Sequence, residues 1–139
     1  MTTNDAMQLA DRYVTIWNQP DADLRRTAVT ELWTEDGVHV LQPPRDVRDA
    51  AAGMGLTSTF EARGHAALER RVTRAYEEFV APGEFVFRGR EDAARVRDVV
   101  TFSWEMAPSG GGEAAGVGRE ILLLDAGGRI RMDYQFIEA

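Results

Sequence analysis

Hydrophobic residues recur every three or four positions in three separate segments of the chain. This spacing places them on one face of a helix and predicts helices over residues 4–18, 21–34 and 64–80. The segments end at the turn-forming sequences NQPD, EDG and APGE. We therefore expect three amphipathic helices, each with one face turned toward a core.

Polar and apolar residues alternate after the last of these helices and predict strands over 84–88, 94–106, 115–124 and 129–137. The sequences APSGGGEAAG and DAGG separate the last three strands, and DAGG is typical of a tight hairpin. A further short strand, VHVLQ, precedes Pro43 and Pro44. This order predicts an α+β fold, with the helices on one face of a curved, mostly antiparallel sheet.

Residues 45–63 give an ambiguous pattern. RDVRDAAAGMG is compatible with a short helix, whereas LTSTFEARG is typical of a loop. A connection of this length between regular elements is often a lid or a binding loop.

The segment RDVVTFSW, residues 97–104, puts a carboxylate on the apolar side of a predicted strand. Val100, Phe102 and Trp104 share one face, and by the same alternation Asp98 joins them. A buried carboxylate is costly unless it is paired or neutral. Asp98 is therefore either an acid of a binding pocket or a structural group that bonds a helix end or a tyrosine.

Composition narrows the possible classes of protein. The 139 residues suffice for one domain, 1–139, with its own core. A formal net charge of −7 disfavours nucleic acid and anionic membrane surfaces as partners, and the lack of cysteine excludes disulfides and thiolate-bound metals. No apolar run is long enough to span a membrane, and the first residues lack the pattern of a signal peptide. We expect a soluble, cytoplasmic protein.

Five short sequence segments, in this order, resemble the nuclear transport factor 2-like superfamily and its SnoaL-like branch: RYVTIWNQPD, ELWTEDGVHVLQPP, RGHAAL, VVTFSW and GREILLLDAGGRI. The resemblance extends over nearly the whole chain. It implies a cone-shaped fold in which a strongly bent sheet wraps three main helices and leaves an internal pocket. Members include ketosteroid isomerases, limonene-epoxide hydrolases, polyketide cyclases and scytalone dehydratases, while others only bind or dimerise. The function therefore has to be argued from the pocket.

The resemblance to ketosteroid isomerases concerns an oxyanion hole made by a tyrosine and a protonated acid. It places the tyrosine at Tyr13 and the acid at Glu120, but the catalytic base of those enzymes corresponds to Leu41. His39 lies two positions before Leu41 and so faces the same side of the strand. It is either a structural histidine of the core or a pocket residue that acts as a base or as a hydrogen-bond partner of an acid. In SnoaL-like cyclases an aspartate near the position of Glu120 acts as the base, and Glu120 can take that role chemically.

The resemblance to limonene-epoxide hydrolases is restricted to Asp98. In those enzymes an Arg-x-Asp pair and a second aspartate hold the attacking water, whereas this chain has Val96 and Gln135 at the other two positions. We do not predict an epoxide hydrolase. If Asp98 and Glu120 share one cavity, their proximity will raise the pKa of one of them.

The last strand allows two orientations. Simple patterning turns its apolar residues toward the core, whereas the resemblance turns Asp133 and Gln135 into the pocket. We adopt the second orientation, which leaves Met132, Tyr134 and Phe136 on the convex face. Apolar side chains on a face without helical cover predict a homodimer through that face.

Four aromatic residues belong either to the core or to a cavity wall, and they favour a flat or polycyclic ligand: Trp17, Trp33, Tyr76 and Trp104. His39 and His65 are not spaced like the ligands of a metal site, so we expect neither a metal nor another cofactor.

The leading hypothesis is a SnoaL-like small-molecule pocket protein. As an enzyme, it would carry out cofactor-free acid–base chemistry of the isomerase, cyclase or hydratase type on an apolar, oxygenated ligand. Glu120 or Asp98 would move the proton, and Tyr13 or His39 would polarise an oxygen. The alternatives are a non-catalytic dimeric ligand-binding or interaction module, and an accessory subunit of a biosynthetic enzyme.

Overall fold

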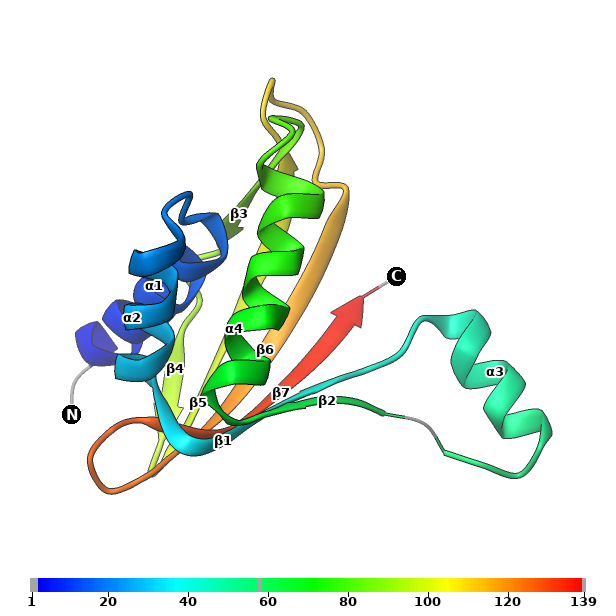
Figure 1. Cartoon of the computed structure of the whole chain (residues 1–139), viewed down its shortest axis with the longest axis horizontal. Helices are drawn as coiled ribbons and strands as arrows, with labels where there is room; N and C mark the ends of the chain where they lie inside the picture. The colour runs from blue at the N-terminus through cyan, green and yellow to red at the C-terminus, as the bar shows by residue number, and fades with distance from the viewer. Residues whose placement is uncertain (1–2, 58, 139) are drawn as a thin grey trace.

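The computed structural model describes residues 3–57 and 59–138, which form one curved sheet with helices on its concave side (Figure 1). The helices are α1 (Thr3–Asn18), α2 (Ala22–Leu32), α3 (Arg45–Gly53), α4 (Gly64–Ala75) and the one-turn π-helix η1 (Tyr76–Val80). The strands are β1 (Trp33–Leu41), β2 (Phe60–Arg63), β3 (Phe85–Gly89), β4 (Ala94–Val96), β5 (Val99–Pro108), β6 (Gly116–Leu124) and β7 (Ile130–Glu138).

The strands form one open sheet in the order β2-β1-β7-β6-β5-β3, and β4 pairs with β5. The β1–β7 pair is parallel and the other pairs are antiparallel. In Figure 1, α4 lies in front of the strands, and α1 and α2 stand to its left. The predicted α+β fold, with three main helices over a bent, mostly antiparallel sheet, is confirmed.

Local chemistry explains where the predicted helices begin and end. Asp21 caps α2 by accepting hydrogen bonds from the backbone amides of Asp23 (2.9 Å) and Leu24 (3.1 Å). The predicted helix 64–80 is α4 followed by η1, and it starts at Gly64, whose φ of +82° suits glycine. The structure ends α2 at Leu32, and β1 begins at Trp33, five residues before the predicted strand.

The predicted strand 94–106 is in fact two strands, β4 and β5. They form a hairpin in which Val96 pairs with Val99, and the loop between them is Arg97 and Asp98. Arg97 adopts a φ of +51°, as tight two-residue hairpin loops require. The turn interrupts the strand. The alternation of side chains along β5 therefore does not predict the side to which Asp98 points.

A β-bulge decides the orientation of β7. Ile130 and Asp133 are both fully buried although three positions separate them, which regular alternation forbids. Across the sheet, Leu124 pairs with Ile130 but Leu123 pairs with Met132, so Arg131 is an extra residue in β7. After the bulge, the even-numbered residues face outward.

The orientation of β7 that we adopted from the resemblance is therefore correct. Asp133 and Gln135 are buried on the concave face, whereas Tyr134 and Phe136 are 36% and 42% exposed.

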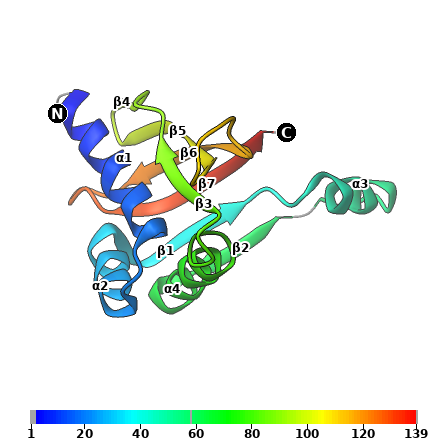
Figure 2. The same ribbon diagram turned by 90° about the horizontal axis from the view of Figure 1, so that it is seen from above.

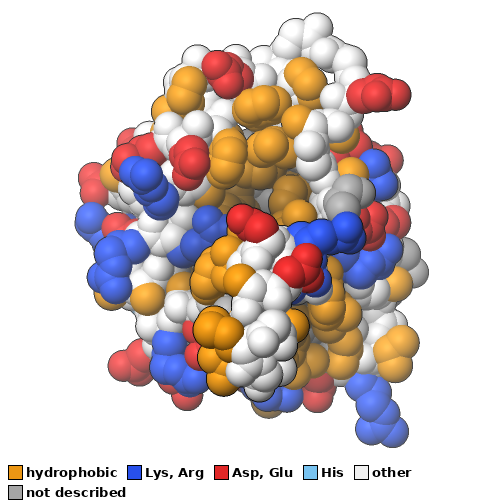
Figure 3. Space-filling model, turned by 90° about the vertical axis from the view of Figure 1, so that its right-hand side faces the viewer, with side chains coloured by type: hydrophobic (Ala, Val, Ile, Leu, Met, Phe, Trp, Pro, Cys, Tyr) orange, Lys and Arg blue, Asp and Glu red, His pale blue; other side chains and the backbone are white. Residues whose placement is uncertain are grey.

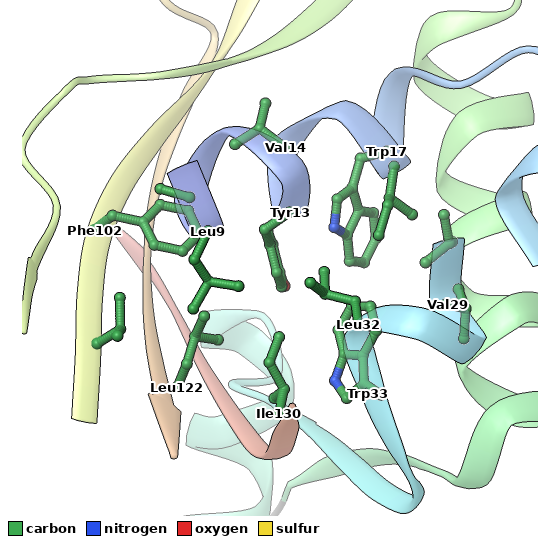
Figure 4. Packing of buried hydrophobic residues seen from close by; sticks show 14 of the residues in the cluster. Leu9, Tyr13, Val14, Trp17, Val29, Leu32, Trp33, Phe102, Leu122 and Ile130 are labelled. Atoms are coloured by element: carbon green, nitrogen blue, oxygen red, sulfur yellow. The ribbon is translucent and has the colours of Figure 1, made fainter. Parts of the chain in front are cut away.

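The core fills the space between α1, α2, α4 and the concave face. Tyr13 of α1 stands in its middle, and Figure 4 shows its ring among Trp17, Trp33 and Phe102. The ring centroids of Trp33 and Phe102 lie 5.5 Å and 5.2 Å from that of Tyr13. This packing places the hydroxyl group of Tyr13, a residue of α1, against strands β6 and β7.

The ambiguous segment 45–63 contains α3 and β2. Helix α3 has no buried residue and stands at the end of an arm, away from α1, α2 and α4 (Figure 2). None of the described helices is long and apolar enough to cross a membrane.

Candidate functional site

The strand register brings four polar side chains together on the concave face. In the β1–β7 pair His39 lies opposite Asp133, and in the β6–β7 pair Glu120 lies opposite Gln135. All four residues are buried, Glu120 and Asp133 completely. Helix α1 adds Tyr13, so residues from α1, β1, β6 and β7 meet at one point, which we call the polar cluster.

The Tyr13 hydroxyl bridges the two carboxyl groups of the polar cluster. Its oxygen lies 2.8 Å from Glu120 Oε1 and 2.5 Å from Asp133 Oδ2. A neutral tyrosine has one hydroxyl hydrogen and can donate to only one of these oxygens. For both contacts to be hydrogen bonds, one carboxyl group must be protonated and donate to the tyrosine oxygen. The geometry thus requires a carboxylic acid in the core.

Trp104 fixes which oxygen of Glu120 can carry this proton. The indole Nε1 donates a hydrogen bond of 2.6 Å to Glu120 Oε2, so an acid proton on Glu120 belongs on Oε1, beside Tyr13. The indole can lie there because its cross-strand neighbour is Gly118. A Cβ atom at position 118 would come within 2.2 Å of the Trp104 ring.

Burial determines the charge of this cluster. It raises the pKa of Glu120 well above its ordinary value of 4.5, and the charge of Asp133 raises it further. Burial likewise raises the pKa of Tyr13 well above 10.0. The pKa of His39 is lowered from 6.5, mainly by burial and further by the positive charge of Arg71, against the attraction of Asp133. These directions favour the neutral forms of all three groups, and for Glu120 they agree with the carboxylic acid that the contact with Tyr13 requires.

His39 is held by Gln135. Its Nε2 lies 2.6 Å from Gln135 Oε1, and because an amide oxygen only accepts, Nε2 carries the hydrogen. The same nitrogen lies 3.8 Å from oxygens of both Glu120 and Asp133. Asp133 Oδ1 is buried without a hydrogen-bond partner among the described residues, so the cluster keeps one unsatisfied acceptor.

His39, Glu120 and Asp133 also have the spacing of metal ligands, with donor atoms within 4.8 Å of one another. One imidazole and two carboxylates suit a divalent metal ion. In this structure, however, Tyr13 bridges the carboxyl oxygens and Gln135 engages His39 Nε2. A metal would have to displace these bonds, and the sequence-based expectation of no metal stays a prediction.

A cavity of about 560 Å³ opens next to the polar cluster. Figure 3 shows the hollowed, mainly hydrophobic face behind α3. Of the residues singled out in the sequence, four line this cavity: Tyr13, Trp17, Trp104 and Gln135. Glu120, His39 and Asp133 are not in its wall, so the polar cluster reaches the cavity through Tyr13 and Gln135. Trp104, which donates to Glu120, lines the cavity as well.

Three predicted site residues lie elsewhere. Trp33 is buried in the core against Tyr13, and the Tyr76 ring lies under the Arg25 guanidinium, 4.8 Å from its centroid. Neither lines the cavity. The prediction that Asp98 faces the pocket is wrong, because its carboxylate stands in the β4–β5 turn, 72% exposed and 4.0 Å from Arg95.

Sequence reasoning missed the arginines of the cavity wall. Arg71 of α4 and Arg45 and Arg48 of α3 line it. A signal existed for Arg71, which comes three residues after Leu68 and four before Ala75, both buried on the inner face of α4. The arginines of α3 carried no comparable signal, because α3 buries none of its residues.

Solved structures with the same arrangement of elements exist. A candidate isomerase of the SnoaL-like family from Agrobacterium tumefaciens matches with a TM-score of 0.77 and 20% identity, over 100% of both chains. A SnoaL-like protein of unknown function from Burkholderia thailandensis matches with a TM-score of 0.68 and 16% identity, over 100% of this chain and 99% of the other. The chain has the SnoaL-like form of the nuclear transport factor 2-like fold. No protein-family model and no curated protein sequence matches it.

A nuclear transport factor 2-like protein of unknown function from Mesorhizobium loti matches less closely, with a TM-score of 0.62 and 14% identity over 99% of this chain and 93% of the other. At these identities the likeness establishes the SnoaL-like fold and leaves the chemistry to the residues themselves.

The protonated state of Glu120 predicts an unusual dependence of stability on pH. Because the native pKa is raised, the native state keeps a proton that the unfolded chain releases above about pH 4.5. The free energy of unfolding therefore falls as pH rises toward the native pKa, by at most about 1.4 kcal/mol per pH unit. Glu120→Gln removes this loss, so the variant should gain stability relative to the wild type as the pH rises from the ordinary value of 4.5 toward the native pKa.

Urea denaturation of both proteins across this range measures the difference. The contribution of His39 has the opposite sign, because its lowered pKa costs stability below pH 6.5, but both proteins keep it. Asp98→Asn is the matched control, since it makes the same carboxyl-to-amide change at an exposed site. Parallel stability curves for the wild type and Glu120→Gln would contradict a protonated Glu120.

Proposed function

We propose that this protein binds an apolar, oxygenated small molecule in its cavity and catalyses a cofactor-free proton transfer on it, of the isomerase, cyclase or hydratase type. The observation that carries the proposal is the three-oxygen contact of Tyr13, Glu120 and Asp133 beside an apolar cavity. Two carboxyl groups that hold one proton between them offer both an acid and a base at the same pH.

The proposed step needs no group from outside the chain. Of the three residues only Tyr13 lines the cavity, so it relays the proton. Its oxygen takes a proton from a carbon next to a ligand carbonyl as its own hydroxyl proton passes to the ionised carboxyl group. The C–H electron pair forms the C=C bond of an enolate. Tyr13 turns its hydroxyl to the enolate oxygen and donates a hydrogen bond to it. In a β,γ-unsaturated ligand the enolate is conjugated with the second C=C bond, so return of the proton to the γ-carbon shifts that double bond and completes an isomerisation with no net gain or loss of protons.

The placement of Tyr13 supports this step. Its side chain belongs both to the cavity wall and to the polar cluster, so it connects the ligand with the carboxyl pair. Its raised pKa keeps the hydroxyl protonated and able to donate. Trp17 and Trp104 supply flat apolar surface next to it, which favours a cyclic ligand.

Hydrogen–deuterium exchange of a bound ketone tests the chemistry without knowledge of the natural substrate. β-Tetralone, a bicyclic ketone with acidic carbon-bound hydrogens, is incubated with the protein in deuterium oxide and followed by NMR. We expect the wild type to accelerate exchange over buffer, and Glu120→Gln and Asp133→Asn to lower that rate by about 10²-fold, the usual contribution of a general acid or base. Asp98→Asn should exchange the ketone like the wild type.

A binding module without catalysis is the second candidate, and the complete burial of Glu120 and Asp133 favours it. In that case the acids only hold α1 against the sheet. β-Tetralone would then bind, as measured by tryptophan fluorescence, yet exchange no faster than in buffer. That result would overturn the catalytic proposal and leave ligand binding intact.

We also propose that two copies associate through the convex face of the sheet. Ile121 pairs with Tyr134 and Leu123 pairs with Met132 across β6 and β7, so apolar side chains adjoin on a face that α1, α2 and α4 leave uncovered. Phe136 extends this surface and is 42% exposed.

Sedimentation at micromolar concentration tests the association. The wild type should sediment as a dimer, and the double variant Tyr134→Ser, Phe136→Ser should shift to the monomer because its apolar contact is lost. Leu24→Ser is the control, since Leu24 is an exposed apolar residue of α2, on the helical side. A monomeric wild type would refute the proposed dimer.

A further inference from the structure

We propose that the ligand of this cavity is an amphipathic carboxylate, whose anionic group binds Arg71 while its apolar body fills the remaining space. This inference rests on the proposed function to the extent that a small molecule occupies the cavity. It adds the chemical class of that molecule and the residue that recognises it.

Arg71 is a cationic group of the cavity wall that lacks a counterion. Its Nε is buried without a hydrogen-bond partner among the described residues, and no carboxylate described in the structure lies within 4.0 Å of its guanidinium. Buried donors are rarely left unpaired, because an unmade hydrogen bond costs free energy. An acceptor from a ligand would satisfy this one.

Trp17 holds the Arg71 side chain in place. The guanidinium carbon lies 5.4 Å from the centroid of the indole ring, within the range of a cation–π contact. This contact uses none of the guanidinium N–H groups as hydrogen-bond donors to a carboxylate, and a guanidinium can bind a planar carboxylate through two parallel N–H groups. The Trp17 Nε1 is a second buried donor without a partner among the described residues, and a carboxylate has two oxygens to offer.

The charge of the cavity wall departs from that of the whole protein. The chain carries a formal net charge of −7, yet the lining contains Arg45, Arg48 and Arg71 against a single acidic residue, Glu138. Arg48 also donates from Nε to the backbone oxygen of Pro43 (3.0 Å), another residue of the lining. An anion in the cavity therefore meets positive charge from the two arginines of α3 as well as from Arg71.

The rest of the lining sets the remaining features of the ligand. Much of it is apolar, with Phe79, Phe87 and Met106 among its members, so a single charged group with an apolar body fits it better than a doubly charged phosphate. The charge of Arg71 also acts on His39 of the polar cluster. A carboxylate on Arg71 thus brings the apolar body next to Tyr13, where the proposed chemistry takes place.

A matched pair of probes tests the inference by titration of tryptophan fluorescence at neutral pH. β-Naphthylacetate and β-naphthylacetamide share the same ring system and differ in charge. We expect the wild type to bind the carboxylate about tenfold more tightly than the amide, which corresponds to about 1.4 kcal/mol. Arg71→Gln should abolish this preference while the amide binds as before, and Arg71→Lys should restore part of it.

Arg74→Gln is the control, because it removes the same charge from an exposed position of the same helix and should keep the preference. Thermal melting of Arg71→Gln verifies that the variant folds. Equal binding of both probes to the wild type, or a preference lost in Arg48→Gln but kept in Arg71→Gln, would overturn the assignment and leave the proposed function standing. Failure of both probes to bind would overturn the inference and the proposed function together.

Discussion

The structure depends on one contact between three oxygen atoms of buried residues. Tyr13 Oη, Glu120 Oε1 and Asp133 Oδ2 meet in the core, and they come from the first helix and the last two strands. Such a contact is stable only if the carboxyl groups share a proton, because two neighbouring buried charges of the same sign repel each other strongly. The features around the contact follow from this constraint: Trp104 donates to the far oxygen of Glu120, and Gly118 leaves room for the indole.

The same constraint explains the irregularity of β7. Ile130 completes the hydrophobic core, and Asp133 must reach Tyr13, yet three positions separate them. A regular strand can bury only one of the two. The extra residue Arg131 changes the alternation, so both side chains point inward and Tyr134 and Phe136 point out. The strand thus has an inner face that carries Asp133 and Gln135 and an outer face that carries Tyr134 and Phe136.

Much of this could be predicted from the sequence, because helical and strand periodicities are local. They predicted the three main helices and the sheet, and the resemblance pointed to Tyr13 and Glu120, which the structure brings into contact. The prediction for Asp98 was wrong for a physical reason. It extended the alternation of the strand through a two-residue turn, and no glycine in the sequence marks that turn. The spacing of Arg71 from Leu68 and Ala75 indicated the inner face of α4, but the sequence does not reveal the cavity that Arg71 lines there.

The central claim is that Glu120 is a neutral carboxylic acid at neutral pH. Infrared spectroscopy tests it directly, since a protonated carboxyl group has a carbonyl-stretching band that a carboxylate lacks. The account predicts such a band at pH 7 in the wild type, shifted by carbon-13 labelling of glutamate and absent from Glu120→Gln. A wild-type spectrum at pH 7 that contains only carboxylate bands would contradict the account, because the three-oxygen contact would then have no proton to hold it together.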